Sequence, residues 1–77
     1  MKKYLIILEK TNTGYSSYSP DLPGCVSTGR TREEVEANMR EAVQFHIDGL
    51  KQEGCEVPEP STLQQPNTDC SYVHVAA

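Results

Sequence analysis

Residues 14–38 read GYSSYSPDLPGCVSTGRTREEVEAN, and this stretch is the most informative part of the sequence for predicting the fold. A short tyrosine-containing strand, 15–19, runs into the turn 20–24, where two prolines fix φ and a glycine can adopt a positive φ. A second strand, 25–28, follows the turn and ends at Gly29. The order of strand, stiff turn, strand and helix start predicts a complete supersecondary unit in about two dozen residues.

The helix start carries the strongest local signal in the chain. Thr31 is placed as an N-cap and Glu34 lies three residues later, which is the spacing of a capping box. Apolar side chains then recur on one side of a long amphipathic helix that ends before Gly54. The predicted stripe consists of Val35, Met39, Ala42, Val43, His46 and Leu50. Phe45 lies off the centre of this stripe, and Ile47 lies only partly on it.

Two further strands are predicted on either side of this unit. Residues 4–8 form a continuous apolar run that favours a buried central strand, and residues 70–75 alternate as a last strand does. The polar, proline-containing connection 56–69 is long because the last strand must travel back along the helix. The order β-β-β-α-β predicts an α+β two-layer domain, built from a three-stranded meander, one long helix and a returning C-terminal strand. At 77 residues we expect one domain, 1–77.

The composition narrows the classes of partner. The net charge is −4 and the seven basic residues are scattered, whereas phosphate binding needs clustered Lys and Arg. Nucleic acid is therefore not expected as a direct partner, and a basic protein is the better electrostatic match. No segment approaches the ~20 apolar residues of a membrane span, and none resembles a secretory signal. Three unpaired cysteines without a CxxC motif favour the reducing cytoplasm, and the small core favours a homo-oligomer.

Three kinds of chemistry can be weighed against simpler readings. Cys25 could be a nucleophile with His46 or His74 as its base, but no third orienting group is identifiable and a buried packing role is favoured. Zinc binding by Cys25, Cys55 and Cys70 lacks the short paired spacing of structural zinc sites, because the gaps are 30 and 15 residues. Both signals are weak, so we expect neither a metal nor a cofactor.

Carboxylates offer the third kind of chemistry. A metal-dependent nuclease needs several carboxylates that converge on its ions, and no motif spacing groups those of this chain. The available ones are Glu9, Asp21, Glu34, Asp48 and Asp69. For Asp21 an Asx-type turn is the simpler role. The acidic outer face of the helix is either a solvated surface or a docking face for a basic partner.

The motif pattern resembles one known family. Residues 15–25, followed at a fixed distance by 29–38 and then by 41–43, are similar to the HicB antitoxin family. The similarity continues through Gly49-Leu50 and 57–60, and it covers nearly all of the chain up to Pro60. PDLPGC followed by the helix start is the specific part of this resemblance.

The resemblance implies a partial ribonuclease H fold without the catalytic carboxylates, and therefore no enzymatic activity. Members of the family bind HicA, a small basic toxin that cleaves mRNA, and mask its RNA-binding surface and active-site histidine. Many relatives add a C-terminal DNA-binding module, whereas this chain ends at Ala77, directly after the last strand. We therefore expect toxin binding without that module.

The leading hypothesis is a HicB-like antitoxin that neutralises a HicA-type toxin by direct binding. The candidate contacts are an exposed turn around Asp21 and Leu22, and Glu33, Glu36 and Glu41 on the helix. The alternative is a solitary HicB-like oligomeric interaction module without a toxin. A Mg²⁺-dependent nuclease ranks third.

Overall fold

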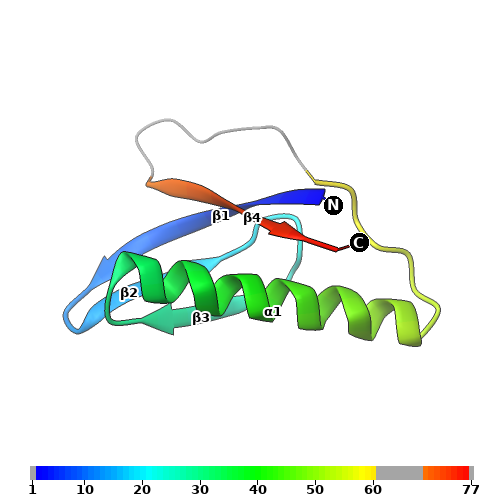
Figure 1. Ribbon diagram of the computed structural model, residues 1–77, viewed down its shortest axis with the longest axis horizontal. Coiled ribbons are helices and arrows are strands. Elements are labelled where there is room, and N and C mark those ends of the chain that lie inside the picture. Colours follow the sequence, from blue (N-terminus) through cyan, green and yellow to red (C-terminus); the bar gives the residue numbers. More distant parts are fainter. Residues whose placement is uncertain (1, 61–68, 77) are drawn as a thin grey trace.

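A four-stranded antiparallel sheet and one helix form two layers in the computed structural model, which describes residues 2–60 and 69–76 (Figure 1). The elements are β1 (Lys2–Thr11), β2 (Gly14–Tyr18), β3 (Val26–Gly29), α1 (Arg32–Gln52) and β4 (Cys70–Val75). The strand order β3-β2-β1-β4 places the apolar first strand in the interior of the sheet, as predicted. The α+β architecture, with its meander and returning strand, is confirmed. The middle of the predicted connection 56–69 lies outside the described residues.

The strand register divides β1 between two faces. Tyr4 lies opposite Val73, and both belong to the core cluster beneath α1. The next residue along β1, Leu5, lies opposite Tyr72 on the other face and is 2% exposed. Side chains on both faces of β1 are therefore buried, which is why its sequence is continuously apolar rather than alternating.

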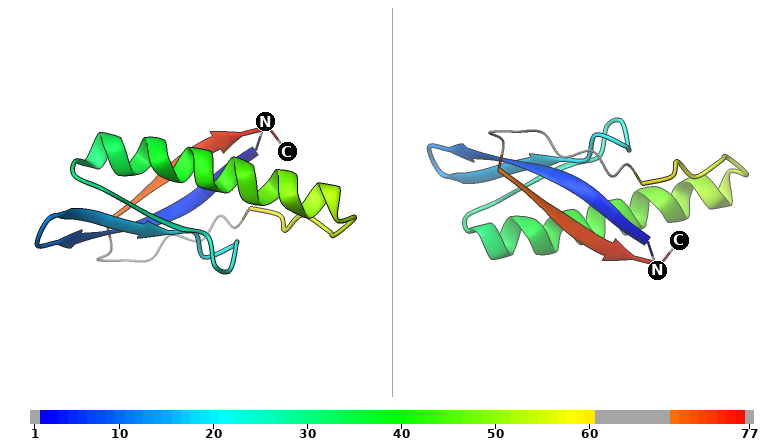
Figure 2. Two further views of the ribbon diagram at one scale, coloured as in Figure 1. Left: turned by 90° about the horizontal axis from the view of Figure 1, so that it is seen from below. Right: turned by 90° about the horizontal axis from the view of Figure 1, so that it is seen from above.

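The buried stripe of α1 follows residues spaced four apart. Its fully buried members are Val35, Met39, Val43 and Ile47. The expected stripe was wrong at its C-terminal end, because Ile47 is buried whereas His46 and Leu50 are only half-buried. The reason is geometric: α1 crosses the strands obliquely, so the contact follows an i±4 row that winds slowly round the helix (Figure 2). The described part of the chain contains no helix long and apolar enough to cross a bilayer.

Both predicted ends of α1 are confirmed. The Thr31 hydroxyl accepts the Glu34 backbone N–H at 3.1 Å, so Thr31 is the N-cap. The Glu34 carboxylate accepts the Arg30 N–H at 3.3 Å, one residue earlier than in the usual capping box. Gly54 follows the helix with φ +72°, the left-handed conformation typical of a helix stop.

The turn between β2 and β3 is built from two successive hydrogen-bonded bends. Leu22 N–H donates to Ser19 O at 3.2 Å, Cys25 N–H donates to Leu22 O at 3.0 Å, and Gly24 adopts φ +83°. The expectation of an exposed Leu22 was wrong, because its side chain is 0% exposed within the core cluster. The bends turn Leu22 inward, beneath α1, whereas Asp21 stays half-exposed.

Candidate functional site

Helix α1 and the edge strand β4 border a groove that consists of two hollows of about 310 and 320 Å³. Arg40 and His74 line both hollows, so the two lie next to each other. The helix side of the groove carries three residues that the sequence analysis singled out. They are Glu33 and Glu36 in the first hollow and Glu41 in the second. The structure thus gathers three of the five candidate contacts along one surface.

Two side chains of α1 fasten the helix to β4. Near the start of β4, the Arg32 guanidinium donates to the Asp69 carboxylate at 2.5 Å and to Cys70 O at 3.4 Å. Near its end, the Gln44 amide donates to Ala76 O at 2.8 Å and accepts the Ala76 N–H at 2.9 Å. We call Arg32 and Gln44 the two clamps. They fix the position of the helix relative to the strand along the groove.

The charge along the groove is mainly negative. Glu33 and Glu41 are exposed, and Glu36 lies 3.4 Å from the guanidinium of Arg32 in a helical i,i+4 pair. The pKa of Arg32 is raised above its ordinary value, first by its hydrogen bond with Asp69. Arg40 is the one cationic residue that lines either hollow among the described residues. Three carboxylates against one guanidinium favour a cationic partner.

The other two candidate contacts do not belong to this groove. Asp21 lies in the turn after β2 and lines neither hollow. The charge of Asp21 is one of the smaller influences that raise the pKa of Tyr4, behind burial of that phenol. Leu22 packs in the core. The turn is therefore a packing element at Leu22, and Asp21 stays a predicted contact at a separate place.

The cysteine and metal alternatives find no assembled site. Cys25 is 4% exposed, and burial raises the pKa of its thiol above the ordinary 9.0, which disfavours the nucleophilic thiolate. Among residues 2–60 and 69–76, no three His, Cys, Asp or Glu side chains are grouped so that they could hold a metal ion. Of the nuclease carboxylates, Glu34 caps the helix and Asp69 is bonded to Arg32.

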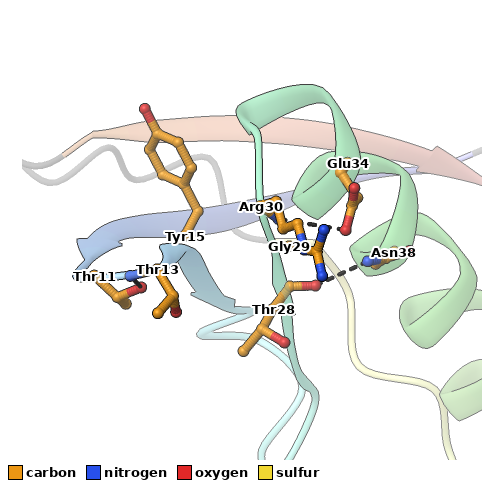
Figure 3. A pocket seen from close by; sticks show the side chains of 8 residues that line it. All are labelled: Thr11, Thr13, Tyr15, Thr28, Gly29, Arg30, Glu34 and Asn38. Carbon is orange, nitrogen blue, oxygen red and sulfur yellow. Dashed lines mark hydrogen bonds between the residues drawn. The ribbon is translucent and has the colours of Figure 1, made fainter.

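A larger polar cleft of about 580 Å³ lies on the β3 side of α1, between the β1–β2 hairpin and the start of the helix (Figure 3). Tyr15 stands on one side, with Arg30, Glu34 and Asn38 on the other (Figure 3). The Asn38 amide donates to Thr28 O at 2.8 Å, and Arg30 N–H donates to the Glu34 carboxylate. These bonds fasten β3 to α1 and give the side chains of Asn38 and Glu34 a role in folding.

Phe45 is the surface feature that the sequence analysis did not assign. Its side chain is 82% exposed on α1, the highest value among the large apolar residues described. Glu41 lies four residues before it and Asp48 three residues after it on the same helix, and both are exposed. Its place off the apolar stripe was the available signal. An exposed aromatic among carboxylates suits contact with a basic protein.

A comparison with protein families finds one match over most of the chain. The model of the HicB-like antitoxins of bacterial toxin–antitoxin systems matches residues 4–76. Among curated proteins, a 14.9 kDa protein from the rep–hol intergenic region of Haemophilus phage HP1 is 42% identical over 62 residues. That match covers 80% of this chain and 47% of the phage protein, so the chain spans about half of that relative.

Solved structures show the same fold. The Burkholderia pseudomallei antitoxin HicB matches with a TM-score of 0.85 and 28% identity, over 97% of this chain and 64% of that one. A chain of a HicA3–HicB3 toxin–antitoxin complex matches with a TM-score of 0.76 and 28% identity, over 97% of this chain and 99% of that one.

Proposed function

The chain belongs to the HicB-like antitoxin family, and on this premise we propose that it binds a HicA-type, mRNA-cleaving toxin and neutralises it by covering its RNA-binding and active surface. In this proposal the chain acts as one domain by direct binding in the cytoplasm, without catalysis, metal or cofactor. It needs no contact with nucleic acid of its own.

The observation that carries the proposal is the line of carboxylates along the α1–β4 groove. Glu33, Glu36 and Glu41 all project from α1 into the lining of the two hollows. A ribonuclease must present basic side chains to the phosphates of RNA. A surface of carboxylates carries the same negative charge as the phosphates, so it can pair with the same basic side chains. The match to a chain from a HicA3–HicB3 complex supports the same kind of partner.

The test is co-expression of the chain with a HicA-type toxin, taken from the neighbouring gene where that gene encodes one. We expect growth to be restored and the two proteins to co-elute. The variant Glu33→Gln/Glu36→Gln/Glu41→Gln should weaken binding by about tenfold or more and make the remaining binding less sensitive to salt, because the screened charge pairs are gone. Persistent toxicity with the unaltered chain, together with no complex on the column, would contradict the proposal.

A matched control separates the groove from net charge. The variant Glu9→Gln/Glu53→Gln/Glu56→Gln removes the same number of charges from exposed residues that line neither hollow. We expect this control to bind within about threefold of the unaltered chain, because distant exposed charges are screened. Equal loss in both triple variants would mean that overall charge, rather than the groove, drives binding.

The oligomeric module is the second candidate, and exposed apolar side chains favour it. Val26 is 64% exposed on the edge strand β3, directly opposite Tyr18 on β2, which is 36% exposed. A second copy covering this pair would remove apolar surface from water. Sedimentation should then show a species of twice the 8.6 kDa chain mass. Only the single-chain mass at high concentration would contradict self-association.

A further inference from the structure

The backbone of β4 presents alternate residues to opposite sides of the strand. Asp69 O accepts the Leu8 N–H of β1 at 2.9 Å. The backbone N–H and C=O groups of the odd-numbered residues of β4 therefore point toward β1. Cys70 and Ala76, both even-numbered, bond to the clamps on α1. The backbone groups of His74 therefore point to the outer edge, into the groove. No bond to the N–H or C=O of His74 is present among the described residues.

The two clamps enclose a stretch of edge that fits a short strand. Arg32 and Gln44 are twelve residues apart on α1, which is ~18 Å at the rise of an α-helix. Cys70 and Ala76 are six residues apart, which is ~20 Å at the rise of a β-strand. The two clamps are therefore separated by nearly the same distance along α1 as their partners are along β4. The Gln44 amide already bonds Ala76 through both N–H and C=O, as a neighbouring strand does.

The carboxylates that line the groove favour a basic segment as the added strand. A strand laid along β4 would turn every second side chain toward Glu33, Glu36 and Glu41 of the helix flank. Lys or Arg at these alternate positions would pair with the carboxylates. A second copy of this chain pairing through its own β4 would present CSYVHV, which contains no Lys or Arg. A basic partner is therefore favoured over self-pairing at this edge.

We infer that the toxin proposed above inserts an extended basic segment between the clamps and adds it to β4 as a further antiparallel or parallel strand. Main-chain bonds to His74 supply part of the affinity, and the carboxylates of α1 select alternating cations. The inference rests on the proposed function and specifies how the same groove recognises its partner. The clamp at Gln44 sets where the added strand ends.

The test compares His74→Pro with His74→Val in binding to the co-expressed HicA-type protein. Proline removes the outward N–H and places its ring where the added strand must approach, while the bonds to β1 are kept. Valine keeps the N–H and removes only the imidazole. We expect His74→Pro to weaken binding by at least about tenfold and His74→Val by less than about threefold. Equal affinity for both variants, at unchanged helical and strand content, overturns the inference.

Hydrogen exchange of the unaltered complex provides a second test that needs no variant. The His74 amide should exchange rapidly in the free chain and slowly in the complex, whereas the Val73 amide, bonded to β1, should be slow in both. An unchanged His74 amide in a formed complex overturns strand addition and leaves the proposed function standing. Protection of His74 in the free chain that grows with concentration would assign this edge to self-pairing instead. Failure of the unaltered chain to bind at all would count against the proposed function.

Discussion

The turn between β2 and β3 and the groove between α1 and β4 contrast in how they use their residues. The turn is the most conspicuous part of the sequence, yet it directs Leu22 and Cys25 into the core. The groove has no continuous motif, because its two sides come from residues 33–44 and 72–76, and it collects carboxylates of α1 and the outward backbone groups of His74. A recognisable motif can thus mark how a chain folds, while the residues proposed to bind a partner lie elsewhere.

The largest effect should come from Leu22→Ala in the turn. Leu22 is fully buried beneath α1, so removing its side chain loses apolar burial and leaves a cavity. We expect the free energy of unfolding to fall by about 3 kcal/mol, measured by urea denaturation. Val26→Ala, at a side chain that is 64% exposed nearby, is the control and should change stability by less than about 0.5 kcal/mol. A small effect of Leu22→Ala would mean that Leu22 does not pack in the core, and the turn would again be a candidate binding surface.

Gly29→Ala should have the next largest effect, because α1 meets β3 by backbone contact. A Cβ at Gly29 would lie 2.5 Å from Val35 N and 2.8 Å from Val35 Cα, so helix and strand must move apart. We expect a loss of about 2 kcal/mol in thermal or urea unfolding. Gly49→Ala in α1, where a Cβ meets nothing within 4 Å, should instead stabilise by about 0.8 kcal/mol. Similar effects at both glycines would show that α1 and β3 can move apart at little cost in stability.

Local rules predicted the features that a few neighbouring residues determine. The Thr31 cap, the Gly24 turn and the interior position of β1 follow from capping, positive φ and continuous hydrophobicity. The burial of Ile47 depends on the angle at which α1 crosses the sheet, and the burial of Leu22 depends on the direction in which the two bends turn its side chain; no local pattern encodes either. The sequence-based expectation failed at these two residues, and at His46 and Leu50, which are only half-buried.

The groove was predictable only in part. The carboxylates Glu33, Glu36 and Glu41 could be chosen from their helix positions, since the outer side of an amphipathic helix is visible in the sequence. Their neighbours on β4 could not, because the pairing of the last strand with β1 fixes which edge α1 approaches. The Gln44 bonds to Ala76 join residues 32 apart and leave no sequence signal.

Gln44→Ala tests the clamp at the far end of the groove. It leaves the Ala76 N–H and C=O without their side-chain partner, at an exposed position where water can replace it. We expect a loss of about 1 kcal/mol in unfolding free energy and faster exchange of the Ala76 amide. Gln52→Ala, at the exposed end of α1, should change neither measurement. Unchanged exchange at Ala76 would mean that the clamp does not persist in solution.

The smallest effect is on the pH dependence of stability, and it again distinguishes the buried turn from the exposed surface. Burial raises the pKa of Cys25 above the ordinary 9.0, so its contribution to stability is complete below pH 9 and is lost as the pH rises toward its folded pKa. The raised pKa of Tyr4, also due chiefly to burial, acts only above its ordinary 10.0. Between pH 9 and 10 the unaltered chain should therefore lose more stability than Cys25→Ala, by less than about 1 kcal/mol in urea unfolding.

The exposed Cys55 provides the internal comparison, because it should react with a thiol reagent at pH 8 well before the buried Cys25 does. Equal reaction rates would show that the turn opens readily, and the contrast between a buried turn and an accessible groove would then be lost.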